Sequence, residues 1–594
     1  MRRRSIIVAV HLSMPSPQVN HNNTQATPQN EMSARFFKWS QTSLGKQLLE
    51  NWRGVAEIAL LAICFALAAG QRAPDVNESH YLCKAKHFWN QSYCPGDIFL
   101  SSSFSHLAFY VSTGWLTKLV SLSTYAWIGR IATWVFLAAG WRAICKQLFS
   151  VQLISVVTGI FFLILNERLH LAGEWVVGGF EAKGIAYGFV LFAIASLLKR
   201  NWQWVWPLLG CASAFHVLVG GWATIAAGAC LLYSMVAPTV REPGGSSSFS
   251  QIVKIQAVPL LVGFLIALVG ILPPLMAESF SPHKAAANAV YVNERVAHHV
   301  NFAMFPIAYV GRFAILILLW QVFSRWFYKS GYLDRTLFYR VKMLEVFALM
   351  TLVFSFTGLL LSGMAEQGGE SAVVAHRFLR FYLFRLSDFA VPASLALVTG
   401  CILSRWIADR GDFPHQVCSS IFMGCILVAG ATMVQENHAD GRPNADARAL
   451  LSDPIDVERT GQIYRNWRKA CDWISQNTDH DAVFITPDQQ QTFKWYAGRA
   501  EVCSWKDVPQ DPGTMAKWRK RIRLLVEPQR DSDLGVFAYS DEQILEMADR
   551  FGATHLLALQ QSAELLEQPT GFRQVYPEDS TARTTFSVFE LVGE

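Results

Sequence analysis

Long apolar segments recur through the first 434 residues, and they constrain the fold more than any other feature of the sequence. About eleven of them are long enough to cross a bilayer, whose hydrocarbon core requires roughly 20 helical residues. Their approximate positions are 54–70, 124–145, 148–165, 184–198, 203–220, 222–238, 255–275, 307–324, 344–364, 388–404 and 416–434. Because 52% of the residues are hydrophobic and only 16% are charged, the sequence predicts a polytopic α-helical membrane protein.

The charged residues between these segments predict which side of the membrane each loop faces. With the N-terminus inside, the inner loops carry thirteen basic and four acidic residues, and the outer loops carry ten basic and eleven acidic residues. Cytoplasmic loops tend to be positively charged, so we predict a multi-pass membrane protein with a cytoplasmic N-terminus. This orientation requires the apolar stretch 104–122 to lie at the interface without spanning. The basic inner loops also explain the net charge of +6 without a nucleic-acid partner.

Both ends of the chain differ in composition from the membrane region at 53–434. Residues 1–52 are polar, and the part rich in Pro, Asn, Gln and Thr predicts partial disorder in a cytoplasmic segment. Residues 435–594 contain strand-like stretches at 482–487, 554–559 and 585–591, with a helical stretch at 541–551. This alternation predicts a small soluble α/β domain. An odd number of spans places it outside, in the periplasm.

The first of four polar clusters in the outer loops follows the first apolar segment directly. Asp75, Glu78, His80 and Tyr81 lie within seven residues of one another. Carboxylates at a membrane boundary are costly unless they are solvated, paired or functional. We predict that Asp75 is a catalytic base, with Glu78 as the alternative, and that His80 and Tyr81 bind substrate. A solvated acidic loop is the competing interpretation.

Two further clusters contribute candidate substrate-binding residues. Glu181 and Lys183 lie two positions apart at the start of the fourth span, where an interfacial ion pair explains them about as well as ligand binding. His298 and His299 suggest a metal at first sight. Adjacent side chains point in different directions, however, and the sequence places no third ligand. No cofactor is predicted with certainty, and a divalent metal is left open.

The fourth cluster is basic and precedes the tenth span. Arg377, Arg380 and Arg385 recur at spacings of three and five, so in a helix they lie largely on one side. Such a face can clamp a lipid-linked phosphate, for which a guanidinium fork is well shaped. The alternative is a basic interfacial helix that touches anionic membrane lipids.

These stretches resemble a known family of membrane enzymes. The segment 75–81 resembles the first-loop acidic motif of the GT-C superfamily of glycosyltransferases, and 127–132 resembles the arginine-bearing start of their second span. The GT-C enzymes also have many spans, a long first outer loop and often a soluble outer C-terminal domain. The segment 377–388 and the His298–His299 pair look like a group of uncharacterised, planctomycete-like bacterial membrane proteins.

The resemblance implies transfer of a hexosyl or pentosyl unit, usually with inversion. The donor would be a polyprenyl-phosphate-linked sugar, and the acceptor a glycan, lipid or protein at the outer face. Asp75 would then accept the proton of the acceptor hydroxyl, and Arg380 and Arg385 would stabilise the leaving lipid phosphate. The usual motif has two adjacent acids, whereas Val76 and Asn77 separate Asp75 from Glu78.

Two interpretations from other classes remain. A secondary transporter commonly has an internal repeat and charges near the membrane midplane. The sequence shows no repeat of fixed period and few charges of that kind. A non-catalytic scaffold with an outer domain would not need acidic and basic residues at the outer ends of several spans.

The 11 cysteines include two pairs within predicted outer regions, Cys83 with Cys94 and Cys471 with Cys503. Each pair can form a disulfide if its region faces an oxidising compartment, and free thiols are the alternative.

Overall fold

The structure is a computed structural model in which ten segments are described. They are 43–237, 249–279, 281–330, 334–409, 413–438, 457–487, 490–525, 540–559, 571–579 and 584–592. The chain divides into two compact units, Met1–Ala56 and Glu57–Glu594, and every contact reported below lies within the second. Most of the predicted disordered segment, 1–42, lies outside the described residues.

Eight helices in the described part of the chain are long and apolar enough to cross a membrane. They are α2 (Ser43–Ala69), α5 (Leu122–Leu148), α9 (Val217–Val236), α10 (Phe249–Ser279), α13 (Ile307–Lys329), α14 (Arg335–Glu366), α16 (Ser387–Ala408) and α17 (Phe413–His438). The protein is therefore a polytopic α-helical membrane protein.

Three of the eleven predicted spans form shorter helices. These are α6 (Ile154–Arg168), α7 (Ala182–Leu198) and α8 (Trp202–Phe215), with 15, 17 and 14 residues. At about 1.5 Å per residue they fall short of the roughly 30 Å hydrocarbon core. Every predicted segment thus coincides with a helix, while only eight of these helices have the length and apolar character of a full span.

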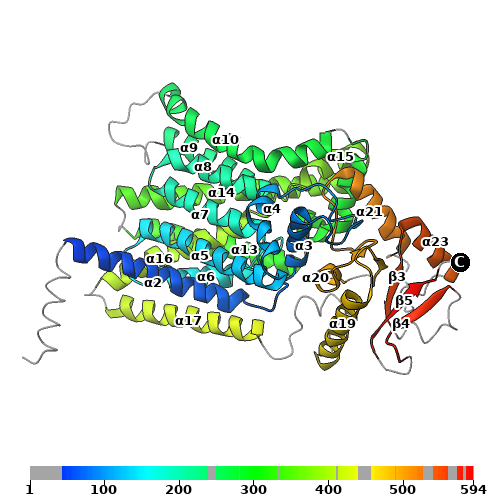
Figure 1. The fold of residues 1–594 in the computed structure, drawn as a ribbon. Coiled ribbons are helices and arrows are strands. Elements are labelled where there is room, and N and C mark those ends of the chain that lie inside the picture. The colour runs from blue at the N-terminus through cyan, green and yellow to red at the C-terminus, as the bar shows by residue number, and fades with distance from the viewer. Residues whose placement is uncertain are drawn as a thin grey trace, which may run out of the picture. The chain divides into compact units, whose positions relative to one another are not determined.

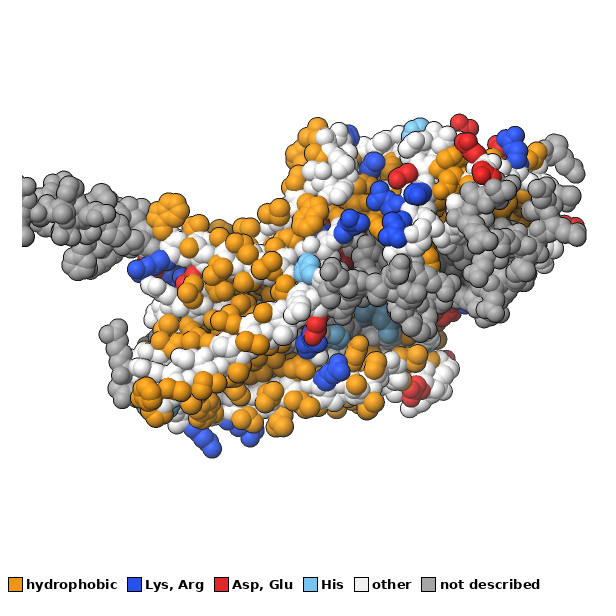
Figure 2. All heavy atoms as spheres, turned by 90° about the horizontal axis from the view of Figure 1, so that it is seen from below, with side chains coloured by type: hydrophobic (Ala, Val, Ile, Leu, Met, Phe, Trp, Pro, Cys, Tyr) orange, Lys and Arg blue, Asp and Glu red, His pale blue; other side chains and the backbone are white. Residues whose placement is uncertain are grey.

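The outward faces of the long helices are apolar. On α17, Ile421 and Val428 are 61% and 65% exposed, and hydrophobic side chains gather over the helices in Figure 2. Helix α16 is instead buried along most of its length between its neighbours. A surface of exposed apolar side chains around a buried central helix fits a bundle whose solvent is lipid.

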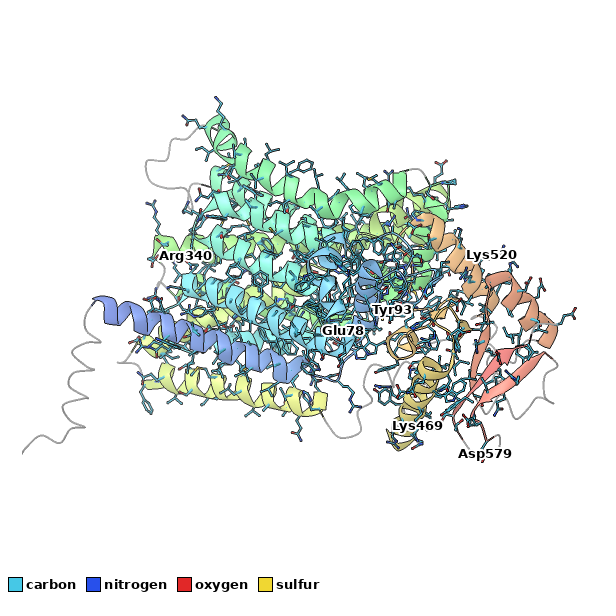
Figure 3. All side chains as sticks on the ribbon, in the orientation of Figure 1. Glu78, Tyr93, Arg340, Lys469, Lys520 and Asp579 are labelled. Atoms are coloured by element: carbon cyan, nitrogen blue, oxygen red, sulfur yellow. The ribbon has the colours of Figure 1, made fainter. Side chains whose placement is uncertain are left out.

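Short helices gather at the end of the bundle from which the C-terminal domain extends (Figure 1). They are α3 (Glu78–Trp89), α4 (Leu107–Thr113), η1 (Gly114–Lys118), α11 (Lys284–Val290), η2 (Tyr291–Arg295), α12 (Ala297–Val300), η3 (Phe302–Met304) and α15 (Gly369–Leu379). The apolar stretch 104–122 contains only α4 and η1, of seven and five residues, so the prediction that it does not span is confirmed. Arg340, predicted on the inner side, lies at the opposite end of the bundle from Glu78 and Tyr93 (Figure 3).

The C-terminal region forms the predicted α/β domain. Its elements are α19 (Val457–Asn477), β1 (Val483–Ile485), α20 (Phe493–Ala497), β2 (Ala500–Glu501), α21 (Pro512–Leu525), α23 (Asp541–Phe551), β3 (His555–Leu559), β4 (Phe572–Tyr576) and β5 (Phe586–Leu591). The strand order is β2-β1-β3-β5-β4. Strand β1 pairs in parallel with β2 and β3, whereas β5 is antiparallel to β3 and β4. The predicted boundary at 435 falls in the last turn of α17, and 439–456 lie outside the described residues.

Successive residues of the central strands face opposite layers of this domain. Phe484 packs with Trp467 of α19 in one core, and Ile485 packs with Trp518 of α21 in the other. Side chains alternate across a strand, so helices are needed on both faces to bury both rows. The outcome is a sheet enclosed between two helical layers.

All 11 cysteines are free thiols, which is the second of the two alternatives that the sequence left open for each pair. Cys471 and Cys503 belong to cores on opposite faces of the sheet, which keeps them apart. Cys83 is buried, and its Sγ lies 3.5 Å from the hydroxyl of Tyr93, which donates a hydrogen bond to it.

Candidate active site

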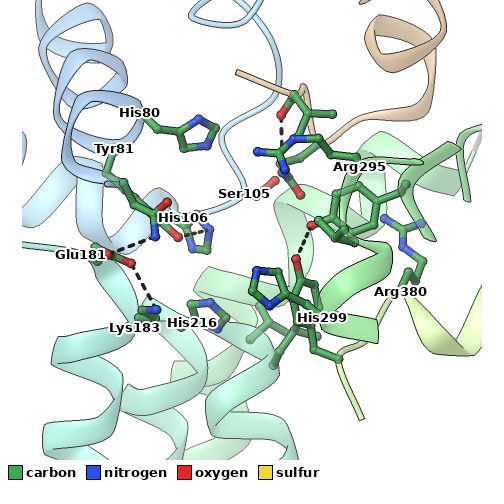
Figure 4. A pocket seen from close by; sticks show the side chains of 18 of the residues that line it. His80, Tyr81, Ser105, His106, Glu181, Lys183, His216, Arg295, His299 and Arg380 are labelled. Atoms are coloured by element: carbon green, nitrogen blue, oxygen red, sulfur yellow. Dashed lines mark hydrogen bonds and ion pairs between the residues drawn. The ribbon is translucent and has the colours of Figure 1, made fainter. Parts of the chain in front are cut away.

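A cavity of about 300 Å³ lies at the end of the bundle where the predicted outer loops meet. Its walls come from the first loop, the segment before α7, the chain between α10 and α13, the turn between α15 and α16, and the C-terminal domain. Eight predicted substrate-binding residues line it: His80, Tyr81, Glu181, Lys183, His298, His299, Arg380 and Arg385. Figure 4 shows His80, Tyr81, Glu181 and Lys183 on one side, with Arg295, His299 and Arg380 on the other. Loops distant in sequence therefore form one site.

Asp75 is half-buried and is not among the residues that line this cavity. Its Oδ2 accepts a hydrogen bond from the backbone N–H of Gly179 at 3.0 Å, and its Oδ1 accepts one from Val76 at 2.7 Å. The bond from Gly179 attaches the first loop to the segment that carries Glu181, and the bond from Val76 lies within the first loop. The role of Asp75 as the base stays a prediction.

Glu78 is fully buried and holds the first loop to the bundle. Its two oxygens accept hydrogen bonds from Nε and Nη2 of Arg130, each at 2.6 Å. They also accept from the backbone N–H groups of Phe180 at 2.7 Å and Asp75 at 2.8 Å. A carboxylate with four such donors has little capacity left to accept a substrate proton, so Glu78 is the weaker of the two first-loop candidates.

Glu181 is the predicted residue whose carboxylate lies in the cavity wall with one oxygen that accepts no hydrogen bond. Its Oε1 accepts a hydrogen bond from Nδ2 of Asn77 at 3.1 Å, while its buried Oε2 has no hydrogen-bond partner. The Nζ of Lys183 lies 3.6 Å from Oε2 and also 3.5 Å from the ring centroid of Trp175. Burial raises the pKa of Glu181; Lys183 opposes this rise and the charge of Asp75 adds to it.

His80 and Tyr81 project from α3 to the cavity wall. The Nδ1 of His80 lies 3.0 Å from Oδ1 of Asp507, a residue of the C-terminal domain. The hydroxyl of Tyr81 lies 3.4 Å from Nε2 of His106. Burial lowers the pKa of His80, against the opposing effect of Asp507, and lowers the pKa of His106 to about 4. The wall thus offers polar but largely neutral hydrogen-bonding groups, which suit hydroxyl-rich ligands.

The two adjacent histidines line the opposite wall. Nδ1 of His299 lies 2.6 Å from the carbonyl oxygen of Ala172. A carbonyl only accepts, so Nδ1 carries the proton and Nε2 is left as an acceptor. Burial, and then neighbouring His298, lowers the pKa of His299 to about 3. Across the described ranges, no group of three His, Cys, Asp or Glu residues could hold a metal ion.

The three predicted arginines do not share one helical face, which corrects that expectation. Helix α15 ends at Leu379, and the chain turns through Tyr382 with a positive φ of 53°. Arg377 is exposed and lies outside the cavity. Arg380 and Arg385 do reach it, but each is paired with a glutamate: Arg380 Nη1 lies 2.5 Å from Glu278, and Arg385 Nε lies 3.1 Å from Glu174.

Several cavity residues were not singled out from the sequence. Asn77 lies inside the first-loop motif and Arg295 lies three residues before the His298–His299 pair, so their positions gave a partial indication. Lys84 and His106 follow the first-loop motif without a pattern of their own. Lys506 belongs to the soluble domain, and only the fold brings it to the cavity.

Comparisons with known proteins give limited matches. No curated protein matches the chain. A family described as a domain of unknown function (DUF6798) matches residues 465–525, which include β1, α20, β2 and α21. The resemblance to planctomycete-like membrane proteins stays a prediction.

Among solved structures, the chain is similar to the archaeal oligosaccharyltransferase AglB from Archaeoglobus fulgidus, in complex with an inhibitory peptide and a dolichol-phosphate. The TM-score is 0.40 at 10% identity, covering 86% of this chain and 70% of that chain. It is also similar to ArnT from Cupriavidus metallidurans bound to undecaprenyl phosphate, with a TM-score of 0.41 at 14% identity, covering 93% of this chain and 100% of that one.

Proposed function

We propose that this protein is an integral-membrane glycosyltransferase of the GT-C type. It would move a sugar from a polyprenyl-phosphate donor to a glycan, lipid or protein acceptor at the outer face of a bacterial inner membrane. The proposal is supported by the first-loop motif and by the cavity in which four outer loops converge. The observation that carries it is Glu181, a buried carboxylate in the cavity wall whose Oε2 accepts no hydrogen bond and faces only the ion-pair partner Lys183, at 3.6 Å.

A transferase of this kind needs a base for the acceptor hydroxyl and positive charge for the leaving phosphate. Glu181 supplies a carboxylate whose free oxygen can accept the proton, and its raised pKa makes it a stronger base than an exposed glutamate. Asp75, the base predicted from the sequence, contributes negative charge that helps to raise the pKa of Glu181. Glycosyl transfer would leave the proton on Glu181 and the phosphate on the lipid.

Glu181→Gln tests this assignment. The amide keeps the size of the side chain but cannot take up a proton, so turnover should fall by roughly 10²–10⁴-fold with donor binding retained. The assay would follow sugar transfer from a polyprenyl-phosphate donor by purified protein, alongside a binding measurement. Wild-type turnover in Glu181→Gln would contradict the assignment.

Asp75→Asn separates the two carboxylates. If Glu181 is the base, removing the charge of Asp75 lowers the pKa of Glu181. The acidic limb of the rate profile should then move to lower pH while activity persists at neutral pH. If Asp75 is the base, Asp75→Asn abolishes transfer at every pH, as predicted from the sequence. Full activity in both Asp75→Asn and Glu181→Gln would remove the support for a glycosyltransferase.

A transporter remains the second candidate, because a cavity among membrane helices can also bind a solute. Purified protein in liposomes would distinguish the two. Solute uptake without sugar transfer would favour the transporter, and an inert protein whose deletion leaves the outer-face glycans intact would favour a scaffold.

A further inference from the structure

The cavity carries more positive than negative charge. Six lysines and arginines and three glutamates line it. Three of the cations are near these glutamates: Lys183 next to Glu174 and Glu181, Arg380 next to Glu278, and Arg385 next to Glu174. A fourth cation, Lys84, donates to the carbonyl of Phe99 at 2.8 Å and to the hydroxyl of Ser102 at 2.6 Å. The remaining two are Arg295 and Lys506.

Arg295 ends the short helix η2 and has most of its donors free. Its Nη2 donates to the backbone carbonyl of Lys506 at 3.2 Å, and its buried Nε has no hydrogen-bond partner. A guanidinium has five N–H donors arranged to fit a phosphate or carboxylate. No carboxylate within the described ranges forms an ion pair with it. The position of Arg295 is therefore fixed by a hydrogen bond, while its positive charge has no counter-ion among the described residues.

Lys506 reaches the same cavity from the C-terminal domain. Among the residues that the structure describes, its side chain has no hydrogen bond or ion pair, although it is half-buried. Its neighbour Asp507 is held by His80 and by Lys494, whose Nζ lies 2.6 Å from it. Burial, and then the charge of Arg295, lowers the pKa of Lys506 to about 8. The guanidinium of Arg295 reaches the backbone of Lys506, so an anion bound at these two cations would relieve their mutual repulsion.

Neutral donors in the same wall also lack partners. The hydroxyls of Ser103 and Ser105 are buried in the cavity lining and make no hydrogen bond within the described ranges. Figure 4 shows Ser105 on the side of the cavity where Arg295 lies. Buried hydroxyls are rarely left without a hydrogen bond, so these two could donate hydrogen bonds to a ligand rich in acceptor oxygens.

We propose that Arg295 and Lys506 form a phosphate-binding site, in which the C-terminal domain supplies one of the two cations that hold the ligand. The proposal rests on the proposed function for its source of phosphate, the headgroup of a polyprenyl phosphate. It places this phosphate on the unpaired cations, whereas the sequence predicted Arg380 and Arg385. Those arginines would then orient Glu278 and Glu174 and shape the cavity.

The test is direct binding by the full chain in phosphatidylcholine nanodiscs, with undecaprenyl phosphate as one probe and inorganic phosphate as the other. Lys506→Gln and Arg295→Gln should each weaken undecaprenyl phosphate binding by roughly 10- to 100-fold, the effect of losing a charge-assisted hydrogen bond. Lys520→Gln and Arg523→Gln are matched controls on α21, both exposed and outside the cavity, and should bind as the wild type does.

A second variant, Lys506→Arg, distinguishes loss of the positive charge from misfolding of the protein. Lys506→Arg keeps the charge and should keep the affinity. Lys506 loses its proton as the pH rises through about 8, so wild-type affinity should fall above that pH. The phosphate itself stays doubly charged there, because its second pKa is near 6. Lys506→Arg should abolish this decline, since arginine stays protonated.

The outcomes separate the sources and the proposals. If Lys506→Gln and Arg295→Gln weaken the binding of inorganic phosphate alone, the natural ligand of the site is a soluble phosphate. If Lys506→Gln and Arg295→Gln bind both probes with wild-type affinity, the proposed site is wrong. If Arg380→Gln and Arg385→Gln weaken binding of undecaprenyl phosphate instead, the clamp predicted from the sequence is correct. Binding is measured without sugar or acceptor. A chain that binds phosphate but transfers no sugar would therefore contradict the proposed function and leave this site standing.

Discussion

At the scale of single residues, the first loop depends on one buried ion pair. Glu78 and Arg130 are both fully buried and share two hydrogen bonds of 2.6 Å. Nη1 of Arg130 also donates to the backbone carbonyl of Gln71 at 2.5 Å. A desolvated pair of this kind adds little net stability over an apolar one, but removal of one charge leaves the other buried and uncompensated. Glu78, the alternative candidate for the catalytic base, thus holds the first loop to the bundle, and we predict that its role is structural.

Glu78→Gln should destabilise the protein by about 3 kcal/mol, because Arg130 would keep its charge without a counter-ion. Thermal unfolding of the detergent-purified protein would measure the loss. Glu370→Gln, at an exposed position of α15, should leave the unfolding temperature unchanged. An unaffected unfolding temperature with abolished turnover in Glu78→Gln would indicate a catalytic role instead.

Gly179 is the second residue on which this arrangement depends. A Cβ there would lie 2.9 Å from Cβ of Asp75 and 2.9 Å from Cγ of Glu78. Gly179→Ala should push the first loop away and lower both stability and turnover. Gly221→Ala in α9, where nothing lies within 4 Å, is the control and should be neutral or slightly stabilising. Equal unfolding temperatures for the two variants would show that the first loop can move to make room for the added methyl group.

At the scale of elements, a buried lysine joins the first loop to the C-terminal domain. Lys494 of α20 forms ion pairs with Asp97 of the first loop at 3.2 Å, with Asp507 at 2.6 Å, and with Glu501 of β2. Asp97 also accepts from the backbone N–H groups of Phe99 and Leu100. The cluster fixes the position from which Lys506 and His80 reach the cavity.

Lys494→Met should loosen this junction, since it leaves three carboxylates buried around an apolar side chain; the expected cost is about 3–5 kcal/mol. Hydrogen exchange should rise in 95–103 and 490–510 and stay low in the membrane helices. Lys469→Met, on an exposed face of α19, is the matched control. Unchanged exchange at 95–103 would show that other contacts hold the domain.

At the scale of the whole molecule, the side of the membrane that the outer loops face determines from which leaflet a donor can reach the cavity. The four predicted outer loops and the C-terminal domain share one end of the bundle, and Arg340 lies at the other (Figure 3). Basic inner loops predict that the shared end is outside. A donor on the outer leaflet could then reach the cavity directly.

Fusions to topology reporters test this orientation. Alkaline phosphatase joined after Val434 should be active, because the enzyme requires an oxidising compartment, and a cytoplasmic reporter at the same point should be dark. A fusion after Lys329, predicted inside, should give the opposite pair of results. An inactive phosphatase after Val434 would place the α/β domain in the cytoplasm.

The sequence by itself determined the elements that depend on local composition. Apolar length predicted the eight long membrane helices of the described ranges, short apolar runs predicted β1 and β3, and alternating hydrophobicity predicted β5, because burial in lipid or in a sheet imposes a pattern on consecutive residues. It also identified the clusters that line the cavity, since unpaired charge near a membrane is conspicuous in a sequence. The resemblance to GT-C enzymes gave the proposed reaction.

Only the tertiary structure decided which charges are free. Glu78 and Glu181 look alike in sequence, yet Glu78 is hydrogen-bonded to buried Arg130, whereas Oε2 of Glu181 accepts no hydrogen bond and has only Lys183 nearby, at 3.6 Å. Arg385 looked available and is paired with Glu174, whereas Lys506 of the C-terminal domain reaches the site unpaired. A charge is neutralised by whichever partner the fold brings within a few ångströms, and those partners lie up to several hundred positions away in the chain.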